Sequence, residues 1–156
     1  MNKIILLTFS ILIVSGCATN ATAPSYAEAP LPEVTCDKAI LYVFRDYAEP
    51  TAWSSYLLVD GKEVISLQQE GFTWVYLAPG DRQFINGWSA LAGMPDVKFN
   101  HSIEAGKLYS FEMKSRVAVN RTSITSTTEI DLLSFDEAEK RLKLCCRYVA
   151  PTDMKQ

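Results

Sequence analysis

The sequence has few of the residues on which enzymes most often depend. Its 156 residues include a single histidine, His101, and neither a Gly-x-Ser-x-Gly turn nor a glycine-rich phosphate loop accompanies it. The carboxylates are scattered, so no pair stands out as general acid and general base. We therefore expect no catalysis and no cofactor, and a hydrolase that uses His101 stays open only as a remote alternative.

Clusters of basic residues are also missing. The chain has 15 lysines and arginines against 18 acidic residues, for a net charge of −3, and the basic residues are dispersed. This distribution argues against a nucleic-acid partner. The cysteines at positions 36, 145 and 146 have no nearby histidine and no spacing typical of metal ligands, so we expect no metal site.

Only the beginning of the chain contains a long apolar run. Lys3 precedes an apolar segment, 4–14, which is shorter than the roughly 20 residues of a membrane-spanning helix and has the length of a secretory h-region. The segment leads into Val14-Ser15-Gly16-Cys17, which resembles the lipobox of bacterial lipoproteins. In that family the cysteine thiol receives diacylglycerol and the chain is cut just before it.

The resemblance implies a signal peptide at 1–16 and lipid attachment at Cys17, so the membrane is a partner through the anchor. The alternative is an ordinary signal peptide that is cut near Ala21 or Ala23. Residue 18 is Ala and not Asp, which in lipoproteins of the enterobacterial type implies the outer membrane, facing the periplasm. Residues 17–35 are rich in Ala, Pro, Thr and Glu, and we expect a flexible tether there.

The remaining sequence predicts an all-β domain over 36–150, followed by a disordered tail at 151–156. Short runs of β-branched and aromatic residues are separated by turn signals every 8–12 residues, a pattern typical of a β-sandwich. We expect a strand at 38–47 and a strand near 121–134. Between them we expect three hairpins, with turns at Asp60-Gly61, at Pro79-Gly80-Asp81 and at Ala105-Gly106-Lys107.

One short helix is predicted near the end of the domain. Ser134 and Glu137 have the Ser-x-x-Glu spacing of a capping box. In the residues that follow, Ala138 and Leu142 share one face with Cys145 or Cys146. The segment from Leu142 to Tyr148 also alternates like a strand, so the pattern leaves the helix boundary open.

Once Cys17 is assigned to lipid, three cysteines remain for a compartment that permits disulfides. A bond between Cys145 and Cys146 would need a strained ring, so we favour Cys36 paired with one of them, with a slight preference for Cys146. Such a bond would close a loop of about 110 residues. Three reduced cysteines are the alternative.

Aromatic residues supply the candidate binding surface. Trp53 and Trp88 lie in loop-like stretches and are candidates for an exposed site, whereas Trp74 lies in an alternating strand and is expected in the core. The competing interpretation is that all three fill the interior of a small sandwich.

Several motifs between residues 39 and 111 resemble an uncharacterised group of small bacterial lipoproteins with a domain of unknown function. The shared motifs are Tyr42-Val43-Phe44-Arg45, Val59-Asp60-Gly61-Lys62-Glu63-Val64, Leu77-Ala78-Pro79-Gly80 and Glu104-Ala105-Gly106-Lys107-Leu108-Tyr109. Their order and spacing are also similar to those of PEGA-type modules of bacterial envelopes.

The resemblance implies a small antiparallel sandwich of PEGA-like or immunoglobulin-like type and carries no activity with it. We therefore expect a lipid-anchored binding or structural module of the envelope, with an envelope protein or glycan as partner. A carrier with a pocket for a small apolar ligand in the sandwich is the alternative.

Overall fold

The computed structural model describes residues 22–152. The signal peptide expected at 1–16 and Cys17 lie outside these residues. The elements in chain order are β1 (Ala39–Arg45), β2 (Ser55–Val59), β3 (Lys62–Leu67), β4 (Gly71–Leu77), β5 (Gly80–Trp88), the 3-10 turn η1 (Ala90–Ala92), β6 (Val97–Ile103), β7 (Leu108–Val119), β8 (Ile124–Leu133), α1 (Phe135–Cys145) and β9 (Arg147–Tyr148).

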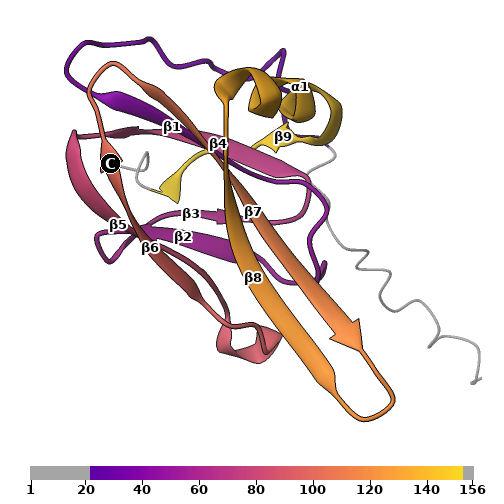
Figure 1. The fold of residues 1–156 in the computed structure, drawn as a ribbon. Coiled ribbons are helices and arrows are strands. Elements are labelled where there is room, and N and C mark those ends of the chain that lie inside the picture. Colours follow the sequence, from indigo (N-terminus) through magenta and orange to yellow (C-terminus); the bar gives the residue numbers. More distant parts are fainter. Residues whose placement is uncertain (1–21, 153–156) are drawn as a thin grey trace, which may run out of the picture.

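The strands form two sheets that pack face to face (Figure 1). The larger sheet has five strands in the order β8-β7-β1-β4-β9, and the smaller has four in the order β3-β2-β5-β6. Most neighbouring strands are antiparallel, and the β1–β7 and β4–β9 pairs are parallel. The predicted all-β sandwich with one short helix is confirmed.

The turn at Asp60-Gly61 joins β2 to β3 in one sheet, as predicted. Both residues have positive φ, 51° and 81°, which suits a tight two-residue hairpin turn. The other two expected hairpins are wrong, because their turns carry the chain from one sheet to the other. The turn at Pro79-Gly80-Asp81 leads from β4 in the larger sheet to β5 in the smaller, and the turn at Ala105-Gly106-Lys107 leads from β6 back to β7.

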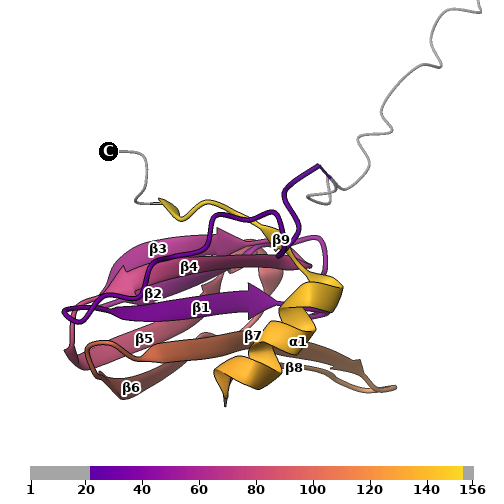
Figure 2. The same ribbon diagram turned by 90° about the horizontal axis from the view of Figure 1, so that it is seen from above.

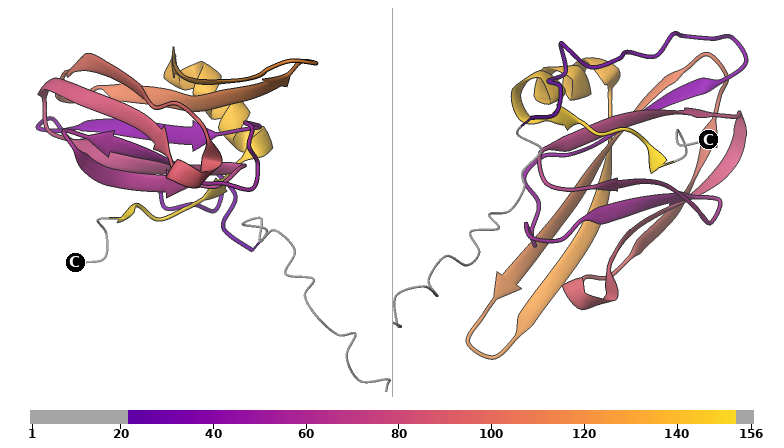
Figure 3. Two further views of the ribbon diagram at one scale, coloured as in Figure 1. Left: turned by 90° about the horizontal axis from the view of Figure 1, so that it is seen from below. Right: turned by 180° about the vertical axis from the view of Figure 1, so that it is seen from behind.

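The longest hairpin joins β7 to β8 and extends past the rest of the sandwich (Figures 1 and 3). The two strands pair from Ser110 with Leu133 to Val119 with Ile124. On its other edge, β7 pairs with β1 only as far as Glu112. The hairpin beyond Glu112 therefore overhangs the strands beside it.

An apolar cluster fills the space between the sheets, and we call it the inner cluster. It includes Leu41 and Val43 of β1, Leu57 of β2, Phe84 of β5 and Phe111 of β7, all fully buried. The rings of Phe84 and Phe111 meet edge to face with their centroids 5.0 Å apart. Alternation along each strand brings these side chains to one face.

A second cluster covers the opposite face of the larger sheet, and we call it the outer cluster. Ile40, Tyr42 and Phe44 of β1 point to this side, where they meet Ala138 and Leu142 of α1. Figure 2 shows the helix lying across the sheet. Since β1 is covered on both faces, all seven of its residues are buried. Ser134 caps the predicted helix, and its hydroxyl accepts a hydrogen bond from the Glu137 backbone N–H.

Residues 22–35, which we expected in a flexible tether, instead pack against the domain. Tyr26 and Ala29 are buried in the outer cluster. The indole of Trp74 donates to the Pro30 carbonyl at 2.7 Å, and the Tyr76 hydroxyl donates to the Glu33 carbonyl at 3.0 Å. The domain therefore begins well before residue 36. It also continues past residue 150, because Pro151, the first residue of the expected tail, is buried.

Candidate functional site

The longer loops of the sandwich gather at one end, which we call the loop end. They are the β1–β2 connection at 46–54, the β5–β6 connection at 89–96 and the β7–β8 turn at 120–123. Strand pairing brings them together, since Arg45 at the end of β1 lies opposite Gly71, while Ser55 at the start of β2 lies opposite Trp88. The other end, the far end, has shorter connections such as Asp60-Gly61.

Arg45 is fully buried between the sheets at the loop end. Its guanidinium donates to four backbone carbonyls, those of Ala48, Pro50, Trp53 and Leu67, at 2.6 to 3.2 Å. Three of these four carbonyls belong to the 46–54 loop. Burial lowers the pKa of Arg45 to about 10. One side chain thus fixes the path of the loop from inside.

The indole of Trp88 packs against the buried Arg45 guanidinium. The Arg45 guanidinium carbon lies 4.6 Å from the ring centroid, close enough for a cation–π interaction. Trp88 is only 4% exposed, and its indole N–H donates to the Thr128 hydroxyl at 3.2 Å. No carboxylate within residues 22–152 forms an ion pair with Arg45.

Neighbouring buried side chains are also polar, so the interior changes character toward the loop end. The Ser55 hydroxyl donates to the Asn86 amide oxygen at 2.5 Å, and the Asn86 amide N–H donates to the Glu129 carbonyl at 3.4 Å. Ser55 and Asn86 are fully buried. We call Arg45, Ser55, Asn86, Trp88 and Thr128 the polar layer.

The 46–54 loop is also tied to the long hairpin. The Ser115 hydroxyl donates to the Glu49 backbone carbonyl, and the Val117 backbone N–H donates to the Glu49 carboxylate at 2.9 Å. These contacts satisfy part of the β7 edge that β1 leaves unpaired. Loop and hairpin therefore form one connected frame.

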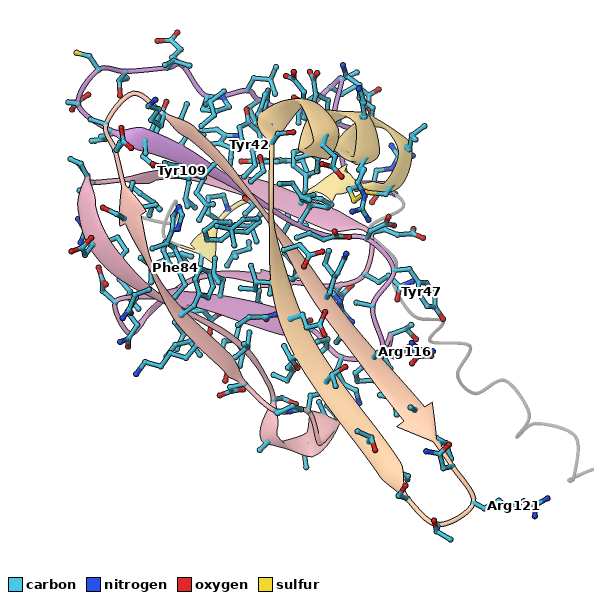
Figure 4. All side chains as sticks on the ribbon, in the orientation of Figure 1. Tyr42, Tyr47, Phe84, Tyr109, Arg116 and Arg121 are labelled. Atoms are coloured by element: carbon cyan, nitrogen blue, oxygen red, sulfur yellow. A yellow bond between two sulfur atoms is a disulfide. The ribbon has the colours of Figure 1, made fainter. Side chains whose placement is uncertain are left out.

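Large apolar side chains project into solvent from this frame and from the β5–β6 connection. Tyr47 is 69% exposed, Leu91 81%, and Val119 and Ile124 72% each, while Trp53 is 37% exposed at the rim. They are five of the eleven large apolar side chains exposed in residues 22–152. Single exposed apolar residues are ordinary on a protein surface, whereas a group of them on one end makes that end a candidate interaction site. Tyr47 and the hairpin end are visible in Figure 4.

The structure separates the two tryptophans proposed as a binding surface. Trp53 lies on the loop end with part of its ring exposed, whereas Trp88 is buried in the polar layer, so the expectation of an exposed Trp88 is wrong. Phe84, Asn86 and Trp88 occupy alternate positions of β5 and point inward together. The period of two from Phe84 would have predicted this position.

The favoured disulfide is also wrong. Cys145 is bonded to Cys146, and Cys36 is an exposed free thiol. Cys146 lies beside the first residues of β4, whereas Cys36 precedes Ala39, which pairs with Leu77 at the end of β4. The length of β4 therefore separates the two cysteines by about 20 Å, far beyond disulfide reach.

His101 lies on β6 against aromatic rings. Its ring centroid is 5.5 Å from that of Tyr109 and 6.2 Å from that of Phe111. In the part of the chain that the structure describes, no side-chain hydrogen bond joins His101 to a serine or carboxylate, and no group of three His, Cys, Asp or Glu residues is arranged to hold a metal ion.

A charged cluster on the outer face of the larger sheet was not predicted from the sequence. Glu112 is 2% exposed and accepts two hydrogen bonds from Arg141 of α1, each 2.5 Å long. Lys114 lies 3.3 Å from the same carboxylate and also pairs with Asp131, and this hydrogen bond to Asp131 raises the Lys114 pKa. The cluster fastens α1 to β7, a structural role.

Comparisons of the chain with models of known protein families, with curated proteins and with solved structures found no match. Over residues 22–152, no helix is both long and apolar enough to cross a membrane. The loop end is the region of the described chain where exposed apolar groups, a fixed frame and a buried charge coincide.

Proposed function

We propose that this chain is a lipid-anchored, non-catalytic binding module of the bacterial envelope. Lipid at Cys17 holds it at the outer membrane, facing the periplasm, and the loop end is its contact surface. The observation that carries the proposal is the group of exposed apolar side chains at this end, Tyr47, Trp53, Leu91, Val119 and Ile124. Tethering raises the local concentration of such a module near its partner.

The rigidity of the loop end supports this function. Arg45 fixes the 46–54 loop through backbone carbonyls, and Glu49 connects that loop to the hairpin. A preorganised surface loses less conformational entropy on binding than a mobile one. Exposed apolar groups on a fixed frame can therefore contact a partner at a low entropic cost.

The packing of the interior favours a surface-binding module over a carrier of a small apolar ligand. A small apolar ligand would have to lie between the sheets, where the rings of Phe84, Phe99 and Phe111 pack on one another with centroids 5.0, 5.2 and 5.5 Å apart. This packing favours a module that binds through its surface.

Two measurements test the proposal. Replacing Cys17→Ala should abolish acylation, detected by the mass of the N-terminal peptide, and should move the protein from the membrane to the soluble fraction. A photoreactive residue placed at Trp53 in intact envelopes should then form adducts that the same residue at Leu108 does not. Leu108 is equally exposed, at 37%, and lies at the start of β7 at the far end. Membrane retention of the Cys17→Ala variant, or equal labelling from both ends, would contradict the proposal.

A further inference from the structure

The described chain starts at the loop end. The Tyr148 backbone N–H donates to the Pro24 carbonyl at 2.8 Å, and Ser25 forms a β-bridge with Arg147. Arg147 is paired with Gly71, which lies opposite the last residue of β1. Figure 2 shows the beginning of the chain beside β9, at the end toward which the β7–β8 hairpin projects.

This placement limits how far the domain can stand from an anchor at Cys17. Pro24 is the first residue bonded to the sheet, through the Tyr148 backbone N–H, so only seven peptide units separate Cys17 from the docked part of the chain. A fully extended chain of that length spans at most about 25 Å. A domain anchored through Cys17 is therefore held close to the bilayer, with the loop end toward it.

The long hairpin projects in the same direction by a similar distance. Seven residues of β7 extend from Glu112, the last residue paired with β1, to Val119. At about 3.3 Å per residue, this stretch reaches about 23 Å past the end of β1, and the 46–54 loop accompanies it as far as Val117. The reach of the anchor and the overhang of the hairpin are comparable, so one membrane surface can meet both.

The chemistry of the hairpin end matches an anionic lipid surface. Residues 115–128, which we call the hairpin tip, include Arg116 and Arg121 and no acidic residue of their own, although the whole chain has a net charge of −3. The Glu49 carboxylate from the 46–54 loop also lies there, where it accepts from the Val117 backbone N–H. Neither arginine forms an ion pair within residues 22–152, and Figure 4 shows Arg121 at the turn, pointing away from the body. Val119 and Ile124 face each other across the two strands and are both 72% exposed.

We infer that the partner of the loop end is the lipid surface of the membrane that holds the anchor. Val119 and Ile124 enter the interfacial region, and Arg116 and Arg121 contact anionic head groups. Trp53 lies on the same end and has the amphipathic ring that favours the interface. This inference rests on the proposed function, since it requires acylation at Cys17, and it makes the hairpin tip a second membrane contact.

The test uses the acylated full chain, purified from membranes in detergent. The protein is reconstituted into vesicles of phosphatidylethanolamine and phosphatidylglycerol with brominated acyl chains, which quench tryptophan fluorescence on contact. The Ile124→Trp variant reports on the hairpin tip. The matched control is Val34→Trp, a β-branched residue that is 65% exposed and precedes Thr35, whose carbonyl lies near Gly106 at the far end.

We expect the tryptophan added at position 124 to lose about half of its fluorescence and the one at position 34 to lose little, each measured against the unsubstituted protein. The double variant Arg116→Glu with Arg121→Glu should reduce that loss by about twofold without releasing the protein from vesicles. Quenching that survives this charge reversal would overturn the role of the arginines.

Flotation of the vesicles and the mass of the N-terminal peptide test the anchor at Cys17 separately from the membrane contact of the hairpin tip. An acylated chain that floats with the vesicles but shows no extra quenching at position 124 overturns the membrane contact and leaves the anchor intact. If quenching at position 124 is absent, a discrete protein crosslink from a photoreactive residue at that position in cells would identify a protein as the partner instead. A chain that carries no lipid overturns both the proposed function and this inference.

Discussion

The two faces of the five-stranded sheet are covered in different ways. The inner face packs on a second sheet through aliphatic and phenylalanine side chains, and becomes polar only at the loop end around Arg45. The outer face is covered by α1 and residues 22–35, and its cluster contains Tyr26, Tyr42 and Tyr148. Hydrogen bonds to backbone carbonyls, such as that from Trp74 to Pro30, supplement the apolar contacts of the outer face.

This difference shows how a small sandwich can use both faces of one sheet. Strand pairing on the inner side fixes the architecture, and segments from both ends of the chain then cover the outer side. Because the covering segment from the beginning of the chain shares an end with the loops, the outer cluster also determines where an anchor at Cys17 would emerge.

The largest effect is expected on the inner face, from Arg45→Met. The variant leaves four backbone carbonyls without their donor, two of them buried and two partly buried, so we expect the free energy of unfolding to fall by about 3–5 kcal/mol. Urea unfolding measures the change. The control is Arg82→Met at the far end, where the ion pair to Asp60 is partly exposed and should contribute less than about 1 kcal/mol. Similar losses in both variants would contradict a special role for the buried guanidinium.

On the outer face, Tyr26→Ala tests whether residues 22–35 belong to the fold. Tyr26 is 6% exposed and packs on Phe72 with ring centroids 5.6 Å apart. Removing the ring should lower the free energy of unfolding by about 2–4 kcal/mol. Leu31→Ala, at a side chain that is 56% exposed, should change it by no more than about 0.5 kcal/mol. A flexible tether would instead tolerate both substitutions equally.

Alkaline pH should weaken the outer cluster through its three buried tyrosines. Burial raises the pKa of Tyr26, Tyr42 and Tyr148 above the ordinary value. Their contribution to stability is therefore complete below about pH 10, where unfolded tyrosine ionises, and is lost as the pH rises through the folded pKa values. Urea unfolding at a series of pH values above about 9 measures how steeply the free energy of unfolding falls with pH. The triple Tyr→Phe variant should show a shallower decline, and an unchanged slope would count against this source of pH dependence.

Local signals in the sequence predicted turns and a helix cap, whereas the sheet that each strand joins depends on long-range pairing. The Asp60-Gly61 turn and the Ser134 cap depend on neighbouring residues and were predicted correctly. The turn at Pro79-Gly80 was predicted as a reversal, but turn residues do not specify which sheet the next strand joins. Tertiary contacts alone make that choice.

The site was predicted only in part. Trp53 was a candidate for the surface and lies there, whereas the burial of Arg45 was missed, because arginine is ordinarily exposed. Residues 22–35 have the composition of a linker, and only Tyr26 and Ala29 among them are buried. Two buried side chains are too few to change the composition, so the docked segment could not be distinguished from a tether.

A smaller effect is expected where α1 begins to cover the outer face. The Ser134→Ala variant removes the acceptor of the Glu137 backbone N–H, and should lower the free energy of unfolding by about 1 kcal/mol. The Ser134→Asp variant retains a capping oxygen and should recover most of this loss. If both variants lose the same amount, the hydroxyl has another role than capping.

The smallest effect is expected from Cys36→Ser. Cys36 is exposed and unbonded, so the free energy of unfolding under non-reducing conditions should change by no more than about 0.5 kcal/mol. A bond from Cys36 to Cys145 or Cys146 would close a loop of about 110 residues, and its removal would cost on the order of 4 kcal/mol. The size of the loss therefore distinguishes the two pairings.

Alkylation of the native protein gives an independent result. Cys36 should react without unfolding, while Cys145 and Cys146 should be recovered in one peptide as a bonded pair. A protected Cys36 would instead support its bond to Cys145 or Cys146, and would require residue 36 to lie about 20 Å from its position near the end of β4.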